Sequence, residues 1–127
     1  MNQKNSKSKP WTNWFEIPVS DMDRAKKFYE TIFNTQIVVR DLGALEMGFF
    51  PNSEVGCALC KNEWYKPGEE GTLVYMNAGP DLQAVQDRIE NAGGKVIMPK
   101  KQISPEYGYM ALFIDSEGNR MALHSEK

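Results

Sequence analysis

Two polar residues of the sequence form a candidate acid–base pair. Glu16 interrupts the apolar run at residues 14–19, and His124, the single histidine of the 127-residue chain, ends a second strand-like segment at residues 120–124. A carboxylate within an apolar strand is uncommon unless it is hydrogen-bonded or used chemically. A Glu–His pair can act as general base and general acid, or it can be a hydrogen-bonded contact that only orients the imidazole ring. The sequence leaves both interpretations open.

The two cysteines, Cys57 and Cys60, form a lone C-x-x-C motif that could indicate redox or zinc chemistry. The surrounding segment, residues 55–60, is typical of a strand. Residues three apart on a strand point to opposite faces, where their side chains diverge too far for a disulfide. A zinc site would need two further ligands, and the chain offers only one histidine. We therefore interpret the motif as two free thiols, in keeping with a cytoplasmic location.

The elements that must position these residues follow from the apolar pattern. Helices are expected at residues 21–33 and 81–92, where apolar side chains recur on one face. Ser20 is expected to cap the first helix at its start and Asn34 at its end. Strands are expected at residues 14–19, 36–40, 45–50, 55–60, 72–77, 95–98, 109–114 and 120–124.

This order of elements occurs twice, at an offset of about 60 residues, with Asp21 matching Asp81. A repeated unit of this kind buries its apolar surface against its twin. We expect an α+β domain of two βαβββ modules whose curved mixed sheet surrounds a cleft. The domain would span residues 11–127, with module one at 11–60, a linker at 61–71 and module two at 72–127.

Composition restricts the partners and the location. The net charge is −2 and the pI about 5.4, so nothing attracts nucleic acid. No apolar stretch approaches the length that a membrane span needs. Residues 1–10 are polar and basic, without the apolar core of a secretory signal, and we expect a disordered tail there. These features predict a cytoplasmic protein.

Two segments carry a resemblance to a known superfamily. WFEIPVSDMDRAKKFYETIF, residues 14–33, resembles the opening of vicinal-oxygen-chelate proteins, and DSEGNRMALH, residues 115–124, resembles their closing turn and last strand. This superfamily includes the glyoxalases, the bleomycin resistance proteins and the extradiol dioxygenases. The resemblance implies the βαβββ fold and pairing into a homodimer. It says little of function, because the fold hosts lyases, epimerases, dioxygenases and drug-binding proteins.

Enzymes of this superfamily hold a divalent metal through His, Glu or Gln side chains on the first and last strands of each module. The resemblance places these positions at Trp14, Ala58, Val74 and Ala122. None of these side chains is an oxygen, imidazole or thiolate donor of the kind that a divalent ion needs. We therefore expect no metal and no other cofactor.

Strand alternation predicts which side chains line the cleft. On the first and last strands, the apolar positions should face the helices, leaving Glu16 and His124 to face the cleft together. Tyr107 could stack on a ring-bearing ligand, or it could close the mouth of the cleft without binding anything. The other expected ligand-binding residues are Trp14, Cys60, Met76, Tyr109, Phe113 and Ala122. Trp64 and Tyr65, in the linker, could cover either the cleft or a partner surface.

An apolar, aromatic cavity with one carboxylate and one imidazole is typical of a small-molecule site. The sequence therefore favours a binding protein that holds a small organic molecule without a metal. The alternative is a lyase or dioxygenase type of enzyme, either metal-free through Glu16 and His124 or with a metal site elsewhere. The sequence does not identify the ligand.

Overall fold

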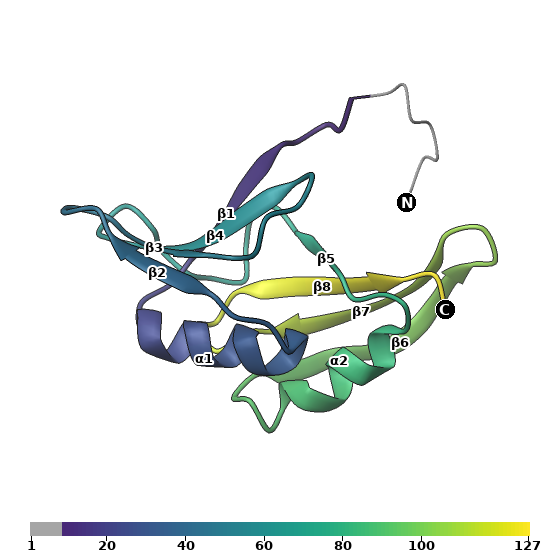
Figure 1. The fold of residues 1–127 in the computed structure, drawn as a ribbon. Helices are drawn as coiled ribbons and strands as arrows, with labels where there is room; N and C mark the ends of the chain where they lie inside the picture. The colour runs from purple at the N-terminus through teal and green to yellow at the C-terminus, as the bar shows by residue number, and fades with distance from the viewer. Residues whose placement is uncertain (1–8) are drawn as a thin grey trace.

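The computed structural model describes residues 9–127, so the tail predicted at residues 1–10 lies almost entirely outside the described residues. Residues 9–127 form ten elements (Figure 1). In the first half these are β1 (Trp14–Pro18), α1 (Met22–Phe33), β2 (Val38–Asp41), β3 (Glu46–Phe49) and β4 (Gly56–Lys61). In the second half they are β5 (Tyr75–Asn77), α2 (Leu82–Ile89), β6 (Lys95–Ser104), β7 (Gly108–Ile114) and β8 (Arg120–Ser125). Among residues 9–127, no helix is long and apolar enough to cross a membrane.

The strands form two four-stranded mixed sheets with the same topology, and neither sheet is closed. The order is β1-β4-β3-β2 in the first sheet and β5-β8-β7-β6 in the second. In each sheet, the strand that precedes the helix pairs in parallel with the last strand of its module, and the remaining pairs are antiparallel. The predicted pair of βαβββ modules is therefore confirmed, with the curved sheet made of two parts.

Helix α1 forms because an apolar stripe is joined to strong end signals. The side chain of Asp21 accepts a hydrogen bond from the backbone N–H of Arg24 at 3.0 Å, so Asp21 is the N-cap, one residue after the predicted Ser20. Asn34 ends the helix in the left-handed conformation, with φ of 52°, as predicted. The buried stripe of the helix consists of Met22, Ala25, Phe28, Tyr29 and Ile32.

The longest difference from the sequence prediction is β6, which continues past Met98 to Ser104. Pro99 and the polar residues that follow it interrupt the apolar alternation, so the pattern ends early. β6 is an edge strand with register shifts against β7, and edge strands tolerate a proline because one of their sides needs no backbone partner. The strand thus extends through β-bulges that periodicity does not reveal.

The helices pack beside each other along the lower edge of Figure 1. Two side chains of α1 contact the second module. The rings of Phe28 on α1 and Phe113 on β7 lie 6.2 Å apart. The hydroxyl of Tyr29, fully buried, donates to the carboxylate of Asp115 at 2.6 Å. One continuous apolar core therefore joins both modules.

Polar contacts from the β7–β8 turn complete this junction. One carboxylate oxygen of Glu117 accepts the backbone N–H groups of Ser20 and Asp21, each at 2.8 Å. The other accepts Nε of Arg24 at 2.7 Å. Asn119 donates to the backbone carbonyl of Pro18 at 2.8 Å. The second module therefore holds the chain segment that leads into α1 of the first module.

The repeat is not uniform, because module two has one extra residue between its first strand and its helix. The backbone N–H of Val19 donates to the carbonyl of Cys60 on β4, and the backbone N–H of Ala78 donates to the carbonyl of His124 on β8. These equivalent residues are 59 positions apart, whereas the N-caps Asp21 and Asp81 are 60 apart. A one-residue shift turns every side chain of a strand to the opposite face.

Candidate functional site

The first sheet has a face turned away from the helices, which we call the helix-free face. Trp14 and Glu16 on β1 lie on it, and Ile17 lies on the opposite side, in the core between sheet and helix. The alternation predicted for this strand therefore holds. The helix-free face also carries Met47 and Phe49 of β3 and Ala58 and Cys60 of β4.

Glu16 places a carboxylate within this apolar surface, and aromatic side chains donate hydrogen bonds to both of its oxygens. The hydroxyl of Tyr65 donates to Oε1 at 2.6 Å, and the indole Nε1 of Trp14 donates to Oε2 at 3.1 Å. The Trp14 ring in turn lies 6.1 Å from the ring of Phe49. The carboxylate is therefore oriented and still exposed, a suitable anchor for a hydrogen-bond donor or a cation on a ligand.

Tyr65 is the residue that sequence reasoning did not assign to the site. The hydrogen bond to Glu16 is the main reason that the pKa of its hydroxyl is raised, and burial adds to it. Tyr65 therefore remains a proton donor over the whole physiological range. The available signal was an aromatic pair, Trp64 and Tyr65, inside an otherwise polar linker. The structure separates the two, because the Trp64 side chain is 81% exposed.

Cys60 lies beside this carboxylate at the base of the helix-free face and is fully buried. Burial, assisted by the negative charge of Glu16, raises the pKa of the Cys60 thiol to about 12. Cys57 faces the helix side of the same strand, and both cysteines are free, so the prediction of two unpaired thiols on opposite faces agrees with the structure. At neutral pH neither thiol is a nucleophile.

In the second sheet, Ala122 and His124 lie on the face away from the helices, as predicted, because Leu123 between them is in the core. The His124 Nε2 is 2.7 Å from the backbone carbonyl of Tyr107. A carbonyl only accepts, so this nitrogen carries the hydrogen. The β6–β7 turn thus fixes the imidazole ring of His124. Tyr107 contributes to this contact through its backbone carbonyl, and its side chain is partly exposed.

The structure does not bring Glu16 and His124 together within one chain. They belong to different sheets, Glu16 is engaged by Tyr65 and His124 by the Tyr107 carbonyl, and they line different pockets. The acid–base pair therefore has no geometric basis within one chain.

Three residues expected in the cleft lie on the helix side instead. Phe113 packs against Phe28 of α1, and Tyr109 packs against the same core with the ammonium of Lys100 4.7 Å above its ring. Strand β7 is apolar on both faces, so its alternation gave no reliable direction. Met76 lies in the core because the extra residue before α2 shifts β5 by one position, which exchanges the faces to which its side chains point.

The metal positions implied by the superfamily resemblance do not fit a metal in this chain. Trp14 uses its only polar hydrogen on Glu16, and indole nitrogen is a donor that cannot bind a cation. Ala58 and Ala122 have no donor atoms, and Val74 packs against the core. Across residues 9–127, no three His, Cys, Asp or Glu side chains are grouped so that they could hold a metal ion.

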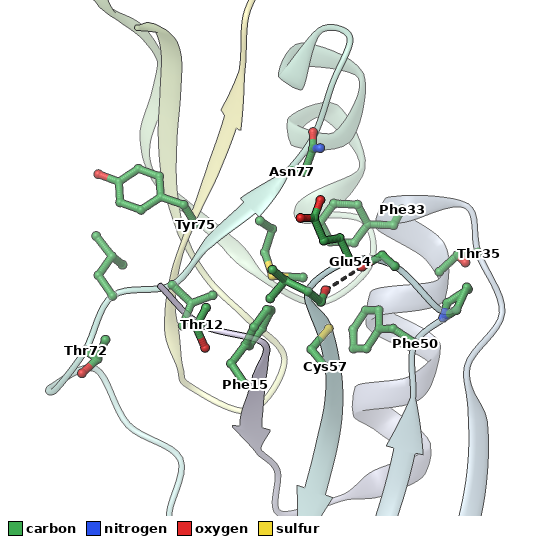
Figure 2. Close-up of a pocket in the computed structure, with 16 residues that line it drawn as sticks. Thr12, Phe15, Phe33, Thr35, Phe50, Glu54, Cys57, Thr72, Tyr75 and Asn77 are labelled. Atoms are coloured by element: carbon green, nitrogen blue, oxygen red, sulfur yellow. Dashed lines mark hydrogen bonds between the residues drawn. The ribbon is translucent and has the colours of Figure 1, made fainter. Parts of the chain in front are cut away.

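A separate pocket of about 910 Å³ opens between the modules on the helix side (Figure 2). Phe15 of β1, Phe33 at the end of α1 and Phe50 after β3 contribute rings, and the chain around β5 forms the opposite wall. Glu54 lies in the β3–β4 loop at this pocket, and Cys57 of β4 also lines it. Sequence reasoning did not find this pocket, because the parity argument considered only the other faces of the sheets.

Two βαβββ modules with the same sheet topology define a known class of small α+β domain. The family model described as the Glyoxalase/Bleomycin resistance protein/Dioxygenase superfamily matches residues 11–123, and the chain belongs to this superfamily. No curated protein matches the sequence of the chain.

Solved structures agree on the fold at low sequence identity. A glyoxalase/bleomycin resistance protein from Albidiferax ferrireducens has a TM-score of 0.73 and 15% identity, over 93% of this chain and 100% of that one. A superfamily member from Sphaerobacter thermophilus has a TM-score of 0.70 and 20% identity, over 92% and 98%. A fosfomycin resistance protein from Listeria monocytogenes has a TM-score of 0.66 and 14% identity, over 94% and 93%. At these identities the likeness concerns the fold alone.

Proposed function

We propose that this superfamily member is a cytoplasmic binding protein that holds a small organic molecule, without a metal, on the helix-free face of its first sheet. The observation that carries the proposal is the Glu16 carboxylate, fixed by Tyr65 and Trp14 within an apolar, aromatic surface. A few fixed polar groups in an apolar surround are what ligand recognition requires.

The proposal includes a homodimer. Trp14 is 40% exposed on the helix-free face of the first sheet, and Tyr75 is 37% exposed on the corresponding face of the second. A second copy that covers these faces would remove apolar surface from water and enclose the ligand. Two free cysteines support the cytoplasmic location.

A pair of neutral ring probes tests the proposed ligand site. 2-Naphthol can donate its hydroxyl hydrogen to Glu16, whereas 2-methoxynaphthalene has the same rings and no such donor. Calorimetric titration should show tighter binding of 2-naphthol, and Glu16→Gln should weaken it about tenfold because the acceptor loses its charge. Glu69→Gln, an exposed exchange in the linker, is the matched control and should change nothing. Equal binding of both probes, or an unaffected Glu16→Gln variant, would contradict the proposal.

A thermal melt tests the metal-free part. A ligand at 100 times its dissociation constant stabilises a protein by about 2.7 kcal/mol, which a thermal melt detects. Because the proposal includes no metal site, addition of Ni²⁺, Zn²⁺ or Fe²⁺ should leave the melting temperature unchanged. A rise in melting temperature that disappears when Glu16 is replaced would show a metal site that the proposal denies.

A further inference from the structure

We propose that the intermodule pocket is a second ligand site, built for a small organic cation with an apolar body. The pocket volume of about 910 Å³ is within the range of small-molecule sites. The proposal does not depend on the function assigned to the helix-free face. It rests on the walls of the pocket and on its charge.

The aromatic wall is fixed before any ligand arrives. The Tyr29 ring stacks parallel to Phe33 at 6.4 Å and meets the edge of Phe50 at 5.7 Å. Tyr29 itself is fully buried and anchored through its hydroxyl to Asp115. The two phenylalanines are partly buried, so they support the core while presenting surface to the pocket. Phe15 contributes a third ring from β1.

The charge of the pocket selects the sign of the ligand. Among the described residues that line it, Glu54 is the only charged one, and the polar ones at the rim, such as Thr12, Thr35 and Asn77, are neutral. Glu54 makes no hydrogen bond or ion pair within residues 9–127. Aromatic ring faces attract cations, and an unpaired carboxylate adds to this attraction. An ammonium group would therefore pair with Glu54 while the apolar body lies against the rings.

The two cysteines make the location of a bound ligand measurable. Cys57 lines the intermodule pocket, whereas Cys60 lies on the opposite face of β4, on the helix-free face. A ligand in the intermodule pocket should slow alkylation of Cys57 and leave Cys60 unchanged. Mass spectrometry of fragmented peptides distinguishes the two positions, so the wild-type chain serves without cysteine replacement.

The experiment compares 1-naphthylmethylammonium with 1-naphthylacetate, which share a ring system and carry opposite charges. Calorimetric titration of the full chain should show the cation binding at least about tenfold more tightly than the anion. Glu54→Gln should weaken the cation about fivefold and improve the anion. Glu106→Gln, an exposed exchange in the β6–β7 turn, is the matched control and should change neither. The cation should also protect Cys57.

Three results would overturn the proposal. The first is equal or absent binding of the two probes, and the second is protection of Cys60 instead of Cys57. The third is cation binding that appears only after removal of residues 1–8 or after dilution. In that case another segment of the chain, or a second copy, would already occupy the pocket in the intact protein. Failure of this site would leave the 2-naphthol test at Glu16 unaffected, because the two sites lie on opposite faces of β4.

Discussion

At the scale of single residues, the thiols of Cys57 and Cys60 show how position on one strand sets reactivity. Burial raises the pKa of Cys57 to about 11, and burial with the charge of Glu16 raises that of Cys60 to about 12. The reactive thiolate is therefore scarce in the folded protein at neutral pH. Alkylation by iodoacetamide at pH 7.5 should be more than about tenfold slower in the folded protein than in urea, with Cys60 slower than Cys57.

The rate of alkylation should rise steadily with pH and show no plateau below about pH 10, because the thiolate fraction keeps growing toward the raised pKa. Peptide mass spectrometry after timed quenching gives both rates. Labelling of Cys60 as fast in the folded as in the unfolded protein would contradict its burial.

Residue identity made some of the site predictable and some of it not. Glu16 could be predicted as a site residue because a carboxylate is rare on an apolar strand unless it is hydrogen-bonded or binds a ligand. Its partner Tyr65 could not, because it comes from a linker 49 positions away, where no periodicity places side chains. Phe113 was placed on the wrong face because large apolar residues occupy both sides of β7.

At the scale of elements, the β6–β7 hairpin depends on the absence of a side chain at Gly108. Its φ is +81°, and a Cβ there would lie 2.4 Å from the backbone oxygen of Ser125. Gly43 has a similar φ of +90° with open space around it. Gly108→Ala should lower the free energy of unfolding by about 3 kcal/mol or more, and Gly43→Ala by only about 1 kcal/mol.

Urea unfolding of both variants measures the comparison, and the difference between them isolates the steric clash from the backbone strain that they share. Equal losses would show that the hairpin can move away from β8. The hydrogen bond between Nε2 of His124 and the carbonyl of Tyr107 provides a second readout. It lies next to Gly108, so it should weaken in the Gly108→Ala variant.

Element order was predictable because the hydrophobic period changes clearly between strands and helices. Element register was not. The extra residue before α2 leaves the helix pattern intact but turns the side chains of β5 to the opposite faces of the sheet, as the hydrogen bond of Ala78 to β8 and the core position of Met76 show. The end of β6 was missed because bulges conceal its alternation.

At the scale of the whole molecule, the Glu117 carboxylate connects the modules and makes stability depend on pH. Burial alone would raise the pKa of Glu117, but hydrogen bonds from Arg24 and from the backbone N–H groups of Asp21 and Ser20 outweigh it and lower the pKa. A carboxyl with a lowered pKa stabilises the fold above its unfolded value of about 4.3, and this stability is lost as pH falls through the lower folded value.

Glu117→Gln should therefore lower the free energy of unfolding at pH 7 by about 1–3 kcal/mol. The difference from wild type should shrink as the pH falls below about 4.3, where the carboxyl of the unfolded chain takes up a proton, and it should vanish once the folded carboxyl is protonated as well. Urea unfolding across this range measures it, with Glu106→Gln as the exposed control. A difference that is constant with pH would assign the loss to packing and not to charge.

The proposed homodimer is the prediction for the assembled protein. Sedimentation velocity should show a dimer at about 10 µM protein, because stable interfaces of this class are much tighter than that. Trp14→Glu places a charge on the surface that the second copy would cover and should shift the protein toward monomer. A wild-type monomer at this concentration would count against the assembly.

The contacts of Glu117 with the start of α1 also have a consequence for the order of synthesis. The residue that accepts the N–H groups of Ser20 and Asp21, just before the helix, lies 97 positions after Ser20. A ribosome therefore makes the helix long before the β7–β8 turn that binds its start. Until this turn emerges, the nascent first module has only its local cap, Asp21, and exposes Phe28 and Tyr29, which later face the second module. The half-made chain is therefore the form of this protein that most needs protection from aggregation.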